Sequence, residues 1–304
     1  MTGFKGSIGI VRNFDSDILK KPMAVAFGSF DGVHIGHQKV LSMAYEIARK
    51  KSLIPAVFIF WPHPRFLLKP RLPFIISGFR DQIEAFERSG IKIVLINRFD
   101  ETIRDMSYHD FIRYILKNIN IKHAVVGYDY TFGKDAQGDT GKLKTLGKMY
   151  RFGVSVVEPV SIEGETVSSS KIRRYLISGD MEKASRMLGR NYSVTARVQR
   201  GNGRGSKIGI PTINLYPKIG LPSDGVYCGS AFTKYGRYKA AINIGNNPTF
   251  GDRHHIEAHL INFSGELTGT VVRLEFERYI RGEIRFADAD ELVSHIIDDI
   301  KRCR

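Results

Sequence analysis

The first half of the chain alternates between short apolar runs and longer segments whose apolar residues recur at helical spacing. Apolar runs occupy residues 23–27, 54–60, 93–96, 123–126 and 154–157, and helix-like segments occupy residues 39–51, 78–89, 107–118 and 140–152. Buried strands that alternate with helices are typical of βαβ units. The pattern predicts a parallel sheet with helices on both faces, and such sheets bind ligands beyond the carboxyl ends of their strands.

The pattern changes after a helical stretch at residues 171–188. Short strand-like runs broken by glycines follow, at residues 192–198, 225–233, 237–244, 255–262 and 270–279, and an amphipathic helix at residues 287–301 ends the chain. Short strands at this spacing predict an antiparallel β-barrel, closed here by the last helix. We therefore expect an α/β domain over residues 1–187 and a β-barrel domain over residues 188–304.

Composition is that of an ordinary globular protein with two domains: 304 residues, 42% hydrophobic and 25% charged. No apolar stretch reaches the length of a membrane span, and no leader-like segment opens the chain, so we expect a soluble cytoplasmic protein without a membrane partner. Cys228 and Cys303 are the two cysteines, which makes a disulfide framework improbable. The net charge of +15 is spread over both halves, without a basic tail, so we expect no nucleic-acid partner.

The segment between the first apolar run and the first helix is a strand-to-helix turn, Gly-Ser-Phe-Asp-Gly-Val-His-Ile-Gly-His over residues 28–37. Such a turn presents free backbone N–H groups and the positive end of a helix dipole, which suits a phosphate. Gly28, Gly32 and Gly36 allow close approach of the backbone. His34 and His37 are three residues apart, so both rings can face one side and donate hydrogen bonds to phosphate oxygens.

A metal site is the alternative, with Asp31 joining the two histidines, but no further Cys or His lies nearby to complete a ligand shell. The strand, the three glycines, Asp31 and the tetrapeptide His-Ile-Gly-His at residues 34–37 together resemble the HIGH signature of the nucleotidyltransferase superfamily. Its members have a Rossmann-like domain and transfer a nucleotidyl group from a nucleoside triphosphate with release of pyrophosphate. A P-loop sequence is not present.

Two later segments fall at strand ends and can share that crevice. Residues 127–133, Gly-Tyr-Asp-Tyr-Thr-Phe-Gly, place aromatic rings around Asp129, either to stack on a planar ligand or simply as core beside a turn. Residues 168–173, Ser-Ser-Ser-Lys-Ile-Arg, open a helix with hydroxyls and cations. They form either a phosphate cradle or a plain N-terminal cap.

With Phe-Trp-Pro-His-Pro at residues 60–64, these segments resemble the adenylyltransferase module of the bifunctional bacterial riboflavin kinase/FAD synthetase family. The chain departs from the family pattern where it has Ser29 for Asn, Tyr130 for Phe and Ser170 for Thr. The resemblance implies that ATP is bound by the first turn and by the Ser-rich segment, while two residues of the later loop lie near the flavin. The implied ATP residues are Gly28, Ser29, Phe30, Asp31, His34, His37, Ser169, Ser170 and Arg173, and the implied flavin residues are Asp129 and Tyr130.

The second half holds its own candidates. Residues 201–209 are too rich in glycine for a strand and carry cations, so they either wrap a polyphosphate or form a plain hairpin loop. Thr212 and Asn214 then point to one face of an extended segment and offer oxygen ligands for Mg²⁺. Glu257 lies in a strand between apolar neighbours, where a carboxylate is either paired or poised as a base.

Five segments, at residues 209–215, 225–227, 247–250, 257–260 and 281–286, resemble in order the motifs of the riboflavin kinase module. The resemblance implies that Glu257 is the catalytic base, that Thr212 and Asn214 bind Mg²⁺, and that Arg281 lies near the flavin. Gly203, Lys207 and Gly209 join Thr212 and Asn214 in the implied ATP site. The implied reactions are phosphorylation of riboflavin to FMN and adenylylation of FMN to FAD, both with ATP.

Two other functions remain open at this point. The first domain could be a mononucleotide adenylyl- or cytidylyltransferase with another substrate. A basic chain that ends in a small barrel could also be a nucleic-acid-binding protein with a degenerate transferase domain. The sequence makes no prediction of the oligomeric state.

Overall fold

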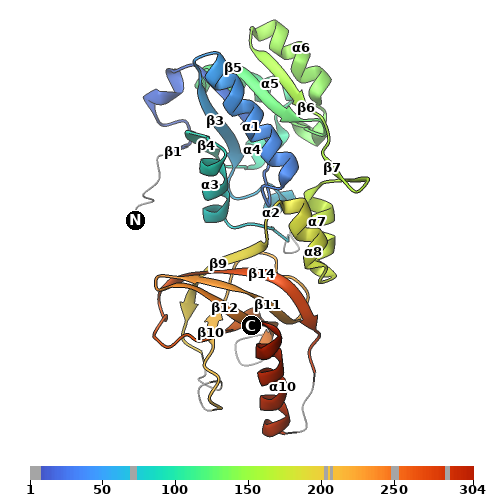
Figure 1. Ribbon diagram of the computed structural model, residues 1–304. Coiled ribbons are helices and arrows are strands. Elements are labelled where there is room, and N and C mark those ends of the chain that lie inside the picture. The colour runs from blue at the N-terminus through green and yellow to red at the C-terminus, as the bar shows by residue number, and fades with distance from the viewer. Residues whose placement is uncertain (1–7, 69–73, 202–204, 206–207, 248–252, 285–287) are drawn as a thin grey trace. The chain divides into compact units, whose positions relative to one another are not determined.

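The computed structural model describes residues 8–68, 74–201, 205, 208–247, 253–284 and 288–304. The chain forms two compact units (Figure 1). One comprises Met1–Pro73 with Phe79–Val167, and the other comprises Phe74–Gly78 with Ser168–Arg304. This division falls before residue 187, because the two helices that precede the barrel belong to the second unit. The division of function near residue 187 stays a prediction.

The first unit is built on a six-stranded sheet in the order β1-β4-β3-β2-β5-β6. All neighbouring strands pair in parallel, as the apolar runs predict. Five strands match predicted runs, while β1 at one edge was not predicted. The strands are β1 (Gly9–Arg12), β2 (Met23–Phe27), β3 (Ile54–Phe60), β4 (Ile93–Asn97), β5 (Ile121–Gly127) and β6 (Gly153–Val157).

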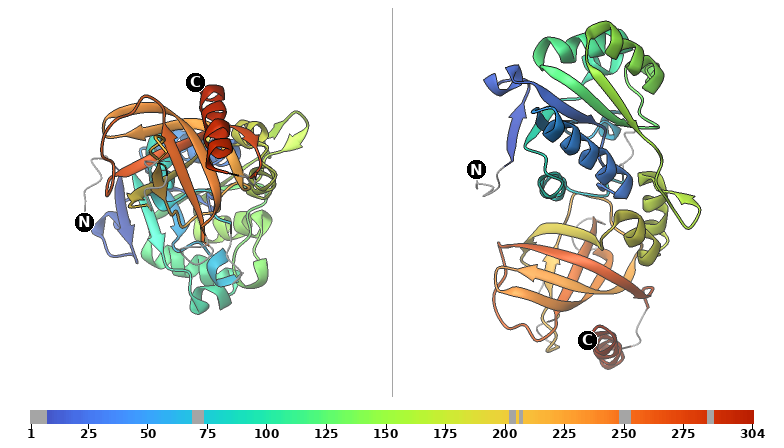
Figure 2. Two further views of the ribbon diagram at one scale, coloured as in Figure 1. Left: turned by 90° about the horizontal axis from the view of Figure 1, so that it is seen from below. Right: turned by 45° about the horizontal axis from the view of Figure 1, so that its top comes forward.

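Helices cover both faces of this sheet, and Figure 2 shows α1 lying along one of them. The α-helices of the unit are α1 (Ile35–Lys50), α2 (Arg65–Leu68), α3 (Phe79–Arg88), α4 (Glu101–Asp105), α5 (Tyr108–Asn118) and α6 (Thr140–Tyr150). Two 3₁₀ turns, η1 (Asp17–Lys20) and η2 (Lys134–Ala136), and the small hairpin β7 (Ser161–Ile162) and β8 (Glu165–Thr166) complete it.

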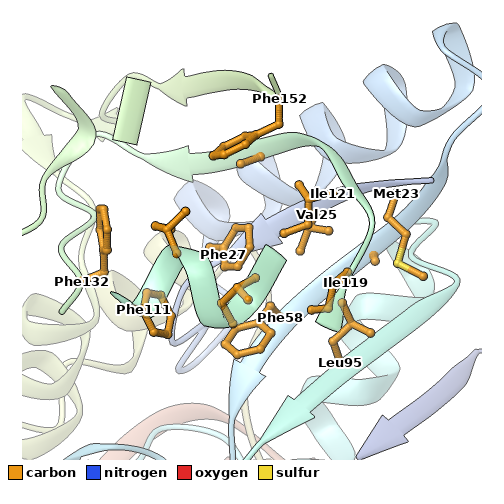
Figure 3. Packing of buried hydrophobic residues seen from close by; sticks show 14 of the residues in the cluster. Met23, Val25, Phe27, Phe58, Leu95, Phe111, Ile119, Ile121, Phe132 and Phe152 are labelled. Atoms are coloured by element: carbon orange, nitrogen blue, oxygen red, sulfur yellow. The ribbon is translucent and has the colours of Figure 1, made fainter. Parts of the chain in front are cut away.

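Alternate residues of the strands fill two cores, one on each side of the sheet, because successive side chains of a strand point to opposite faces. Val25 and Phe27 of β2 pack with Phe58, Phe111 and the neighbouring residues of one core (Figure 3). The intervening Ala26 packs with residues of α1 and α3 in the other core. Burial on both faces explains why these strands read as continuous apolar runs.

The strand order reverses beside β2. From β2 the chain adds β3 and then β4 on one side, and later adds β5 and β6 on the other. Loops that leave two adjacent strands at such a switch point diverge and open a crevice, where ligands of open α/β sheets bind. The loop after β2 carries the His-Ile-Gly-His motif, and the loop after β5 carries Asp129.

The second unit contains a closed barrel in the order β10-β13-β12-β11-β14-β9, with all neighbours antiparallel. The predicted barrel is confirmed, with β10 as a short additional strand. Tyr192, Tyr227 and Phe276 are fully buried aromatic residues of its strands. The strands are β9 (Tyr192–Gln199), β10 (Ile213–Leu215), β11 (Gly225–Thr233), β12 (Gly236–Asn247), β13 (Arg253–Leu260) and β14 (Val271–Arg281).

The helical stretch expected at residues 171–188 consists of two helices, α7 (Ser169–Ile177) and α8 (Met181–Leu188). Gly179, at φ +75°, turns the chain between them. Asp180 then caps α8 by accepting a hydrogen bond from the Lys183 N–H.

The last helix, α10 (Ala289–Arg302), is joined to the barrel by a disulfide between Cys228 of β11 and Cys303. Our prediction that a disulfide is improbable is wrong in this structure. The packing of α10 against the barrel explains the difference, since Ile300 and both sulfurs lie in one small apolar cluster. The two cysteines are 75 residues apart in the chain, so their spacing gave no sign of this contact.

Candidate active sites

The His34 ring caps the first turn of α1. Its Nδ1 accepts a hydrogen bond from the His37 backbone N–H at 3.3 Å. Since Nδ1 is the acceptor, the neutral ring carries its proton on Nε2, which is then a donor. The two imidazoles stack, with centroids 3.6 Å apart and planes 16° from parallel. Both predicted phosphate-binding histidines therefore stand side by side at the positive end of the helix.

The turn that leads to this cap is held in an unusual backbone conformation. Phe30, Gly32 and Val33 all have positive φ, at 50°, 82° and 40°. For Phe and Val this conformation is costly, so the surroundings must impose it. The Phe30 ring packs edge-on against His37 and Phe86, and its carbonyl accepts a hydrogen bond from a buried glutamine, Gln82. Strained turns of this kind concentrate at functional sites.

Glycines keep space open around the same turn. A Cβ on Gly28 would lie 3.2 Å from the Phe30 ring, and a Cβ on Gly36 would lie 3.2 Å from the His34 ring. Ser29 is exposed, whereas the Asp31 side chain is fully buried. Of the predicted residues in this turn, Ser29 is open to solvent and Asp31 is part of the packed interior.

The loop after β5 separates the two residues predicted near the flavin. Asp129 is exposed at the carboxyl end of β5. The Tyr130 ring stacks on Phe132, with centroids 5.6 Å apart, and packs against Phe27. Burial raises the pKa of the Tyr130 hydroxyl, so Tyr130 stays neutral. Tyr130 is therefore packed against the core of the first unit, and its contact with a flavin stays a prediction.

A polar row crosses three strands of the barrel. Glu257 of β13 is directly opposite Asn214 of β10 and directly opposite Asn243 of β12. Opposed residues of paired strands project to the same face. The neighbours of Glu257 in β13, Ile256 and Ala258, are fully buried, so the polar row lies on the outer face of the barrel. The structure thus brings two predicted kinase residues, Asn214 and Glu257, together.

Two described residues of the glycine-rich segment, Gly201 and Gly205, lie beside Asn214 and Thr212. A Cβ on Gly201 would overlap the side-chain amide of Asn214, and a Cβ on Gly205 would lie 3.2 Å from the Thr212 hydroxyl. Glycine at these two positions lets the backbone approach both predicted Mg²⁺ ligands. Gly209 is exposed at φ +77°. Gly203 and Lys207 lie outside the described residues.

A histidine that the sequence analysis did not select contacts Glu257. His255 Nε2 lies 3.3 Å from Glu257 Oε1, and Nδ1 lies 3.0 Å from the Gly245 carbonyl oxygen. The hydrogen bond to Glu257 is the main cause that raises the pKa of His255, while burial acts in the opposite direction.

Comparison with known proteins decides the identity of the chain. The FAD synthetase family matches residues 17–171, and the riboflavin kinase family matches residues 188–304. A bifunctional riboflavin kinase/FMN adenylyltransferase of Bacillus subtilis is 35% identical over 90% of this chain and 89% of its own. That of Haemophilus influenzae is 32% identical over 92% of this chain and 93% of its own.

The chain belongs to the bifunctional riboflavin kinase/FMN adenylyltransferase family. The predicted family is confirmed, and no comparison favours either of the two other functions. A crystal structure described as a macrolide-efflux protein from Streptococcus pneumoniae has the same fold, with a TM-score of 0.86, 28% identity and coverage of 98% of this chain and 99% of its own. Among the described residues, no helix has the length and apolar character needed to cross a membrane.

Not all adenylyltransferase residues predicted for this family member lie in one compact unit. Ser169, Ser170 and Arg173 belong to α7 in the second unit, apart from His34 and His37 in the first. Ser168 caps α7 by accepting a hydrogen bond from the Lys171 N–H, and Arg173 Nε donates to the Phe74 carbonyl at 2.7 Å. Arg173 thus holds residues 74–78 to the helix. Its contact with phosphate stays a prediction.

Arg281, predicted near the flavin, forms a buried ion pair with α10. Its Nη2 lies 2.6 Å from Asp299 Oδ2, and the two side chains are 17% and 6% exposed. The guanidinium is therefore engaged in fastening α10 to β14. A metal site at Asp31, His34 and His37 finds no support, since the described part of the chain holds no group of three or more His, Cys, Asp or Glu residues suited to a metal ion.

Sequence reasoning missed Asn243 and His255, which lie beside the predicted kinase residue Glu257. His255 is two residues before Glu257, and residues at that spacing in a strand share a face. That signal was present in the sequence. Asn243 could be found only from the pairing of β12 with β13, which depends on the register of the barrel.

Proposed function

We propose that the barrel unit phosphorylates riboflavin at the outer face that carries Glu257, and that the α/β domain adenylylates FMN at the turn that carries His34 and His37. The opposition of Glu257 and Asn214 across β13 and β10, beside the glycine-rich segment, is the observation that carries the kinase site. The division of function is proposed near residue 187, and the cytoplasm is the expected compartment.

In the kinase step, Glu257 takes the proton of the terminal ribityl hydroxyl. The ribityl O–H bond breaks and its oxygen forms a bond to the γ-phosphorus of ATP. The bond from that phosphorus to the β,γ-bridging oxygen breaks, and its electrons leave with ADP. Phosphoryl transfer asks mainly for positioning and charge stabilisation, which the backbone N–H groups of the glycine-rich segment would supply.

The residues at the barrel face fit a magnesium ion that arrives with ATP. Thr212 and Asn214 offer neutral oxygen atoms, and Mg²⁺ commonly takes few protein ligands and completes its shell with phosphate and water. Gly201 and Gly205 bring the backbone close to these two side chains. When bound, the ion would neutralise phosphate charge. Thr212 and Asn214 would hold it, and Gly209 with Gly203 and Lys207 would contact the phosphates.

In the adenylyl transfer, the FMN phosphate attacks the α-phosphorus of ATP, and pyrophosphate leaves. The phosphate of FMN is already an anionic nucleophile at neutral pH, so the protein supplies no base. His34 and His37 donate hydrogen bonds to the triphosphate, and the positive end of the α1 dipole adds to them. The rest of the turn (Gly28, Ser29, Phe30 and Asp31) shapes this pocket. Ser169, Ser170 and Arg173 are proposed as further phosphate contacts, and Asp129, Tyr130 and Arg281 as flavin contacts.

The direct test is incubation of the full chain with riboflavin, ATP and Mg²⁺, followed by chromatography of the flavins. We expect FMN first and FAD later, and neither product when a chelator removes the metal ion. Unchanged riboflavin in the presence of folded protein would contradict the proposal. Formation of FMN without FAD would contradict only the role that we propose for the first unit.

A further inference from the structure

We propose that His255 is a positioning residue for the kinase reaction, because it holds one carboxylate oxygen of Glu257 and leaves the other to accept the proton of the substrate hydroxyl. This inference rests on the proposed function of Glu257 as the base. It concerns a residue that has no part in the family motif described above, which begins at Glu257.

The His255 ring is fixed on three sides. Its side chain is 6% exposed, whereas that of Glu257 is 41% exposed. Nδ1 contacts the Gly245 carbonyl of β12 at 3.0 Å, and the ring stacks on Tyr216 with centroids 5.4 Å apart and planes 14° from parallel. Only Nε2 is left to face Glu257 Oε1. A buried ring with three contacts therefore holds a half-exposed carboxylate.

The partners of the ring determine where its protons are. A carbonyl oxygen can only accept, so Nδ1 carries a hydrogen. An ionised carboxylate can also only accept, so Nε2 carries a hydrogen as well, and the ring is an imidazolium. The raised pKa of His255 agrees with this assignment.

The described groups that face His255 come from three neighbouring segments. Glu257 shares β13 with it, and Tyr216 follows β10. The Glu283 carboxylate lies beside Gly245, whose carbonyl contacts His255 Nδ1. Two of these groups are carboxylates, and an aromatic ring face also favours a cation. The charges around the ring therefore favour its protonated form.

Two variants separate positioning from simple packing. His255→Leu removes the donor, so kcat for FMN formation should fall about 10-fold to 100-fold, as expected when a catalytic group is displaced by a fraction of an ångström to 1 Å. The KM values for ATP and riboflavin should change far less. His255→Gln places an amide N–H near the position of Nε2 and cannot titrate. It should restore most of kcat.

The dependence of kcat on pH distinguishes positioning from packing, because a loss of packing alone would not change its shape. In the parent protein, kcat should fall on the alkaline side as His255 loses its proton, because the neutral ring keeps one N–H for two acceptors, the Gly245 carbonyl and Glu257. His255→Gln should lack this limb. His259 is the matched control, since it lies on the same face of β13 but contacts the Pro211 carbonyl at 2.8 Å. His259→Gln should keep the alkaline limb, whatever its rate.

The outcomes distinguish this inference from the proposed function. If Glu257→Gln keeps the kinase rate, the base assignment fails. If Glu257→Gln loses the rate while His255→Leu stays within two-fold of the parent with the same alkaline limb, the positioning role alone fails. Should His255→Leu not fold, ¹⁵N NMR of the parent decides, with the His255 signals assigned by their loss in His255→Gln. A pKa of His255 above 6.5 that falls in Glu257→Gln is expected, and a pKa that does not respond to Glu257→Gln would overturn the inference.

Discussion

His34 caps the start of α1 through its Nδ1, so the proton of the neutral ring lies on Nε2. Both histidines and their common orientation could be predicted from the sequence, since spacing three is enough to place two rings on one side of a helix start. The positive φ of Phe30 and Val33 could not, because it depends on the packing of the Phe30 ring against Phe86 from a distant helix.

The role of Gly36 can be tested by comparison with Gly141, which has the same position in another helix. Gly36 and Gly141 are each two residues after a helix N-cap, and a Cβ on either would lie 3.2 Å from the cap side chain, His34 or Asp139. Alanine should favour both helices by up to about 1 kcal/mol in intrinsic propensity. Gly36→Ala should nevertheless lower FAD formation from FMN about 10-fold by displacing the His34 ring.

Gly141→Ala is the control, and its rate of FAD formation should stay close to that of the parent. Initial rates with FMN supplied, together with thermal unfolding of both variants, check this expectation. Equal rates in the two variants would argue against a role of the His34 ring in the adenylyl transfer.

His123 gives the first unit a dependence on pH. It is buried at the start of β5, with Nε2 2.8 Å from the Ser155 hydroxyl and Nδ1 3.4 Å from Lys51 Nζ. Burial, and secondly the charge of Lys51, lower the pKa of His123 below its ordinary 6.5. The unfolded chain therefore takes up the proton more readily, so the stabilising contribution of neutral His123 is complete above about pH 6.5 and is lost as the pH falls through the lowered pKa.

An NMR titration of the imidazole should find the His123 pKa below 6.5, and Lys51→Met should raise it. Lys50→Met removes the charge of an exposed residue next to Lys51, and the pKa of His123 should stay unchanged. A His123 pKa that does not respond to Lys51→Met would show that the lysine has no influence on the ring.

At the level of elements, the strands predicted at residues 23–27, 54–60 and 225–233 have the observed bounds. An apolar run with turn residues at both ends is enough to predict such a strand from its local sequence. The edge strand β1 was missed because Ile10 and Val11 are its two apolar side chains, and β7 and β8 were missed because each has two residues. The break between α7 and α8 lies at Gly179, whose positive φ turns the chain after the first helix.

The attachment of α10 to the barrel depends on an ion pair that can be tested with two adjacent aspartates. Asp299→Asn leaves the Arg281 guanidinium buried beside an uncharged partner, which typically costs about 3–5 kcal/mol. Asp298→Asn removes an exposed pair with Lys301, where the side chains are 59% and 64% exposed, and should change the free energy of unfolding far less.

Urea unfolding of the two variants, followed by a probe in the barrel unit, measures the difference. Similar stability of both variants would contradict the structural role of Arg281. If Asp299→Asn is folded but its KM for riboflavin rises sharply, the predicted flavin contact of Arg281 gains support.

At the scale of the whole molecule, the sequence predicted the two folds and their order along the chain, because the hydrophobic period changes between the halves. It could not predict that residues 74–78, far from the barrel in sequence, belong to the second unit, where Arg173 holds them. Nor could it predict the disulfide between β11 and the residue after α10, which depends on how that helix packs. Long-range contacts of this kind leave no local pattern.

The central claim is that one chain holds two separate catalytic sites, and reciprocal loss of the two activities tests it most directly. Glu257→Gln keeps the size of the side chain but removes the base, so FMN formation should fall by about 10² to 10⁴, the usual worth of a general base. FAD formation from supplied FMN should hardly change. His37→Ala combined with Arg173→Ala should do the reverse, and FMN should accumulate from riboflavin.

Both rates are measured for each variant by chromatography of the flavins, with folding checked by circular dichroism. The account predicts that each variant loses one activity and keeps the other. If either variant, while folded, lost both activities, or if Glu257→Gln kept its kinase rate within a few-fold of the parent, the account of two separate sites with Glu257 as the kinase base would be contradicted.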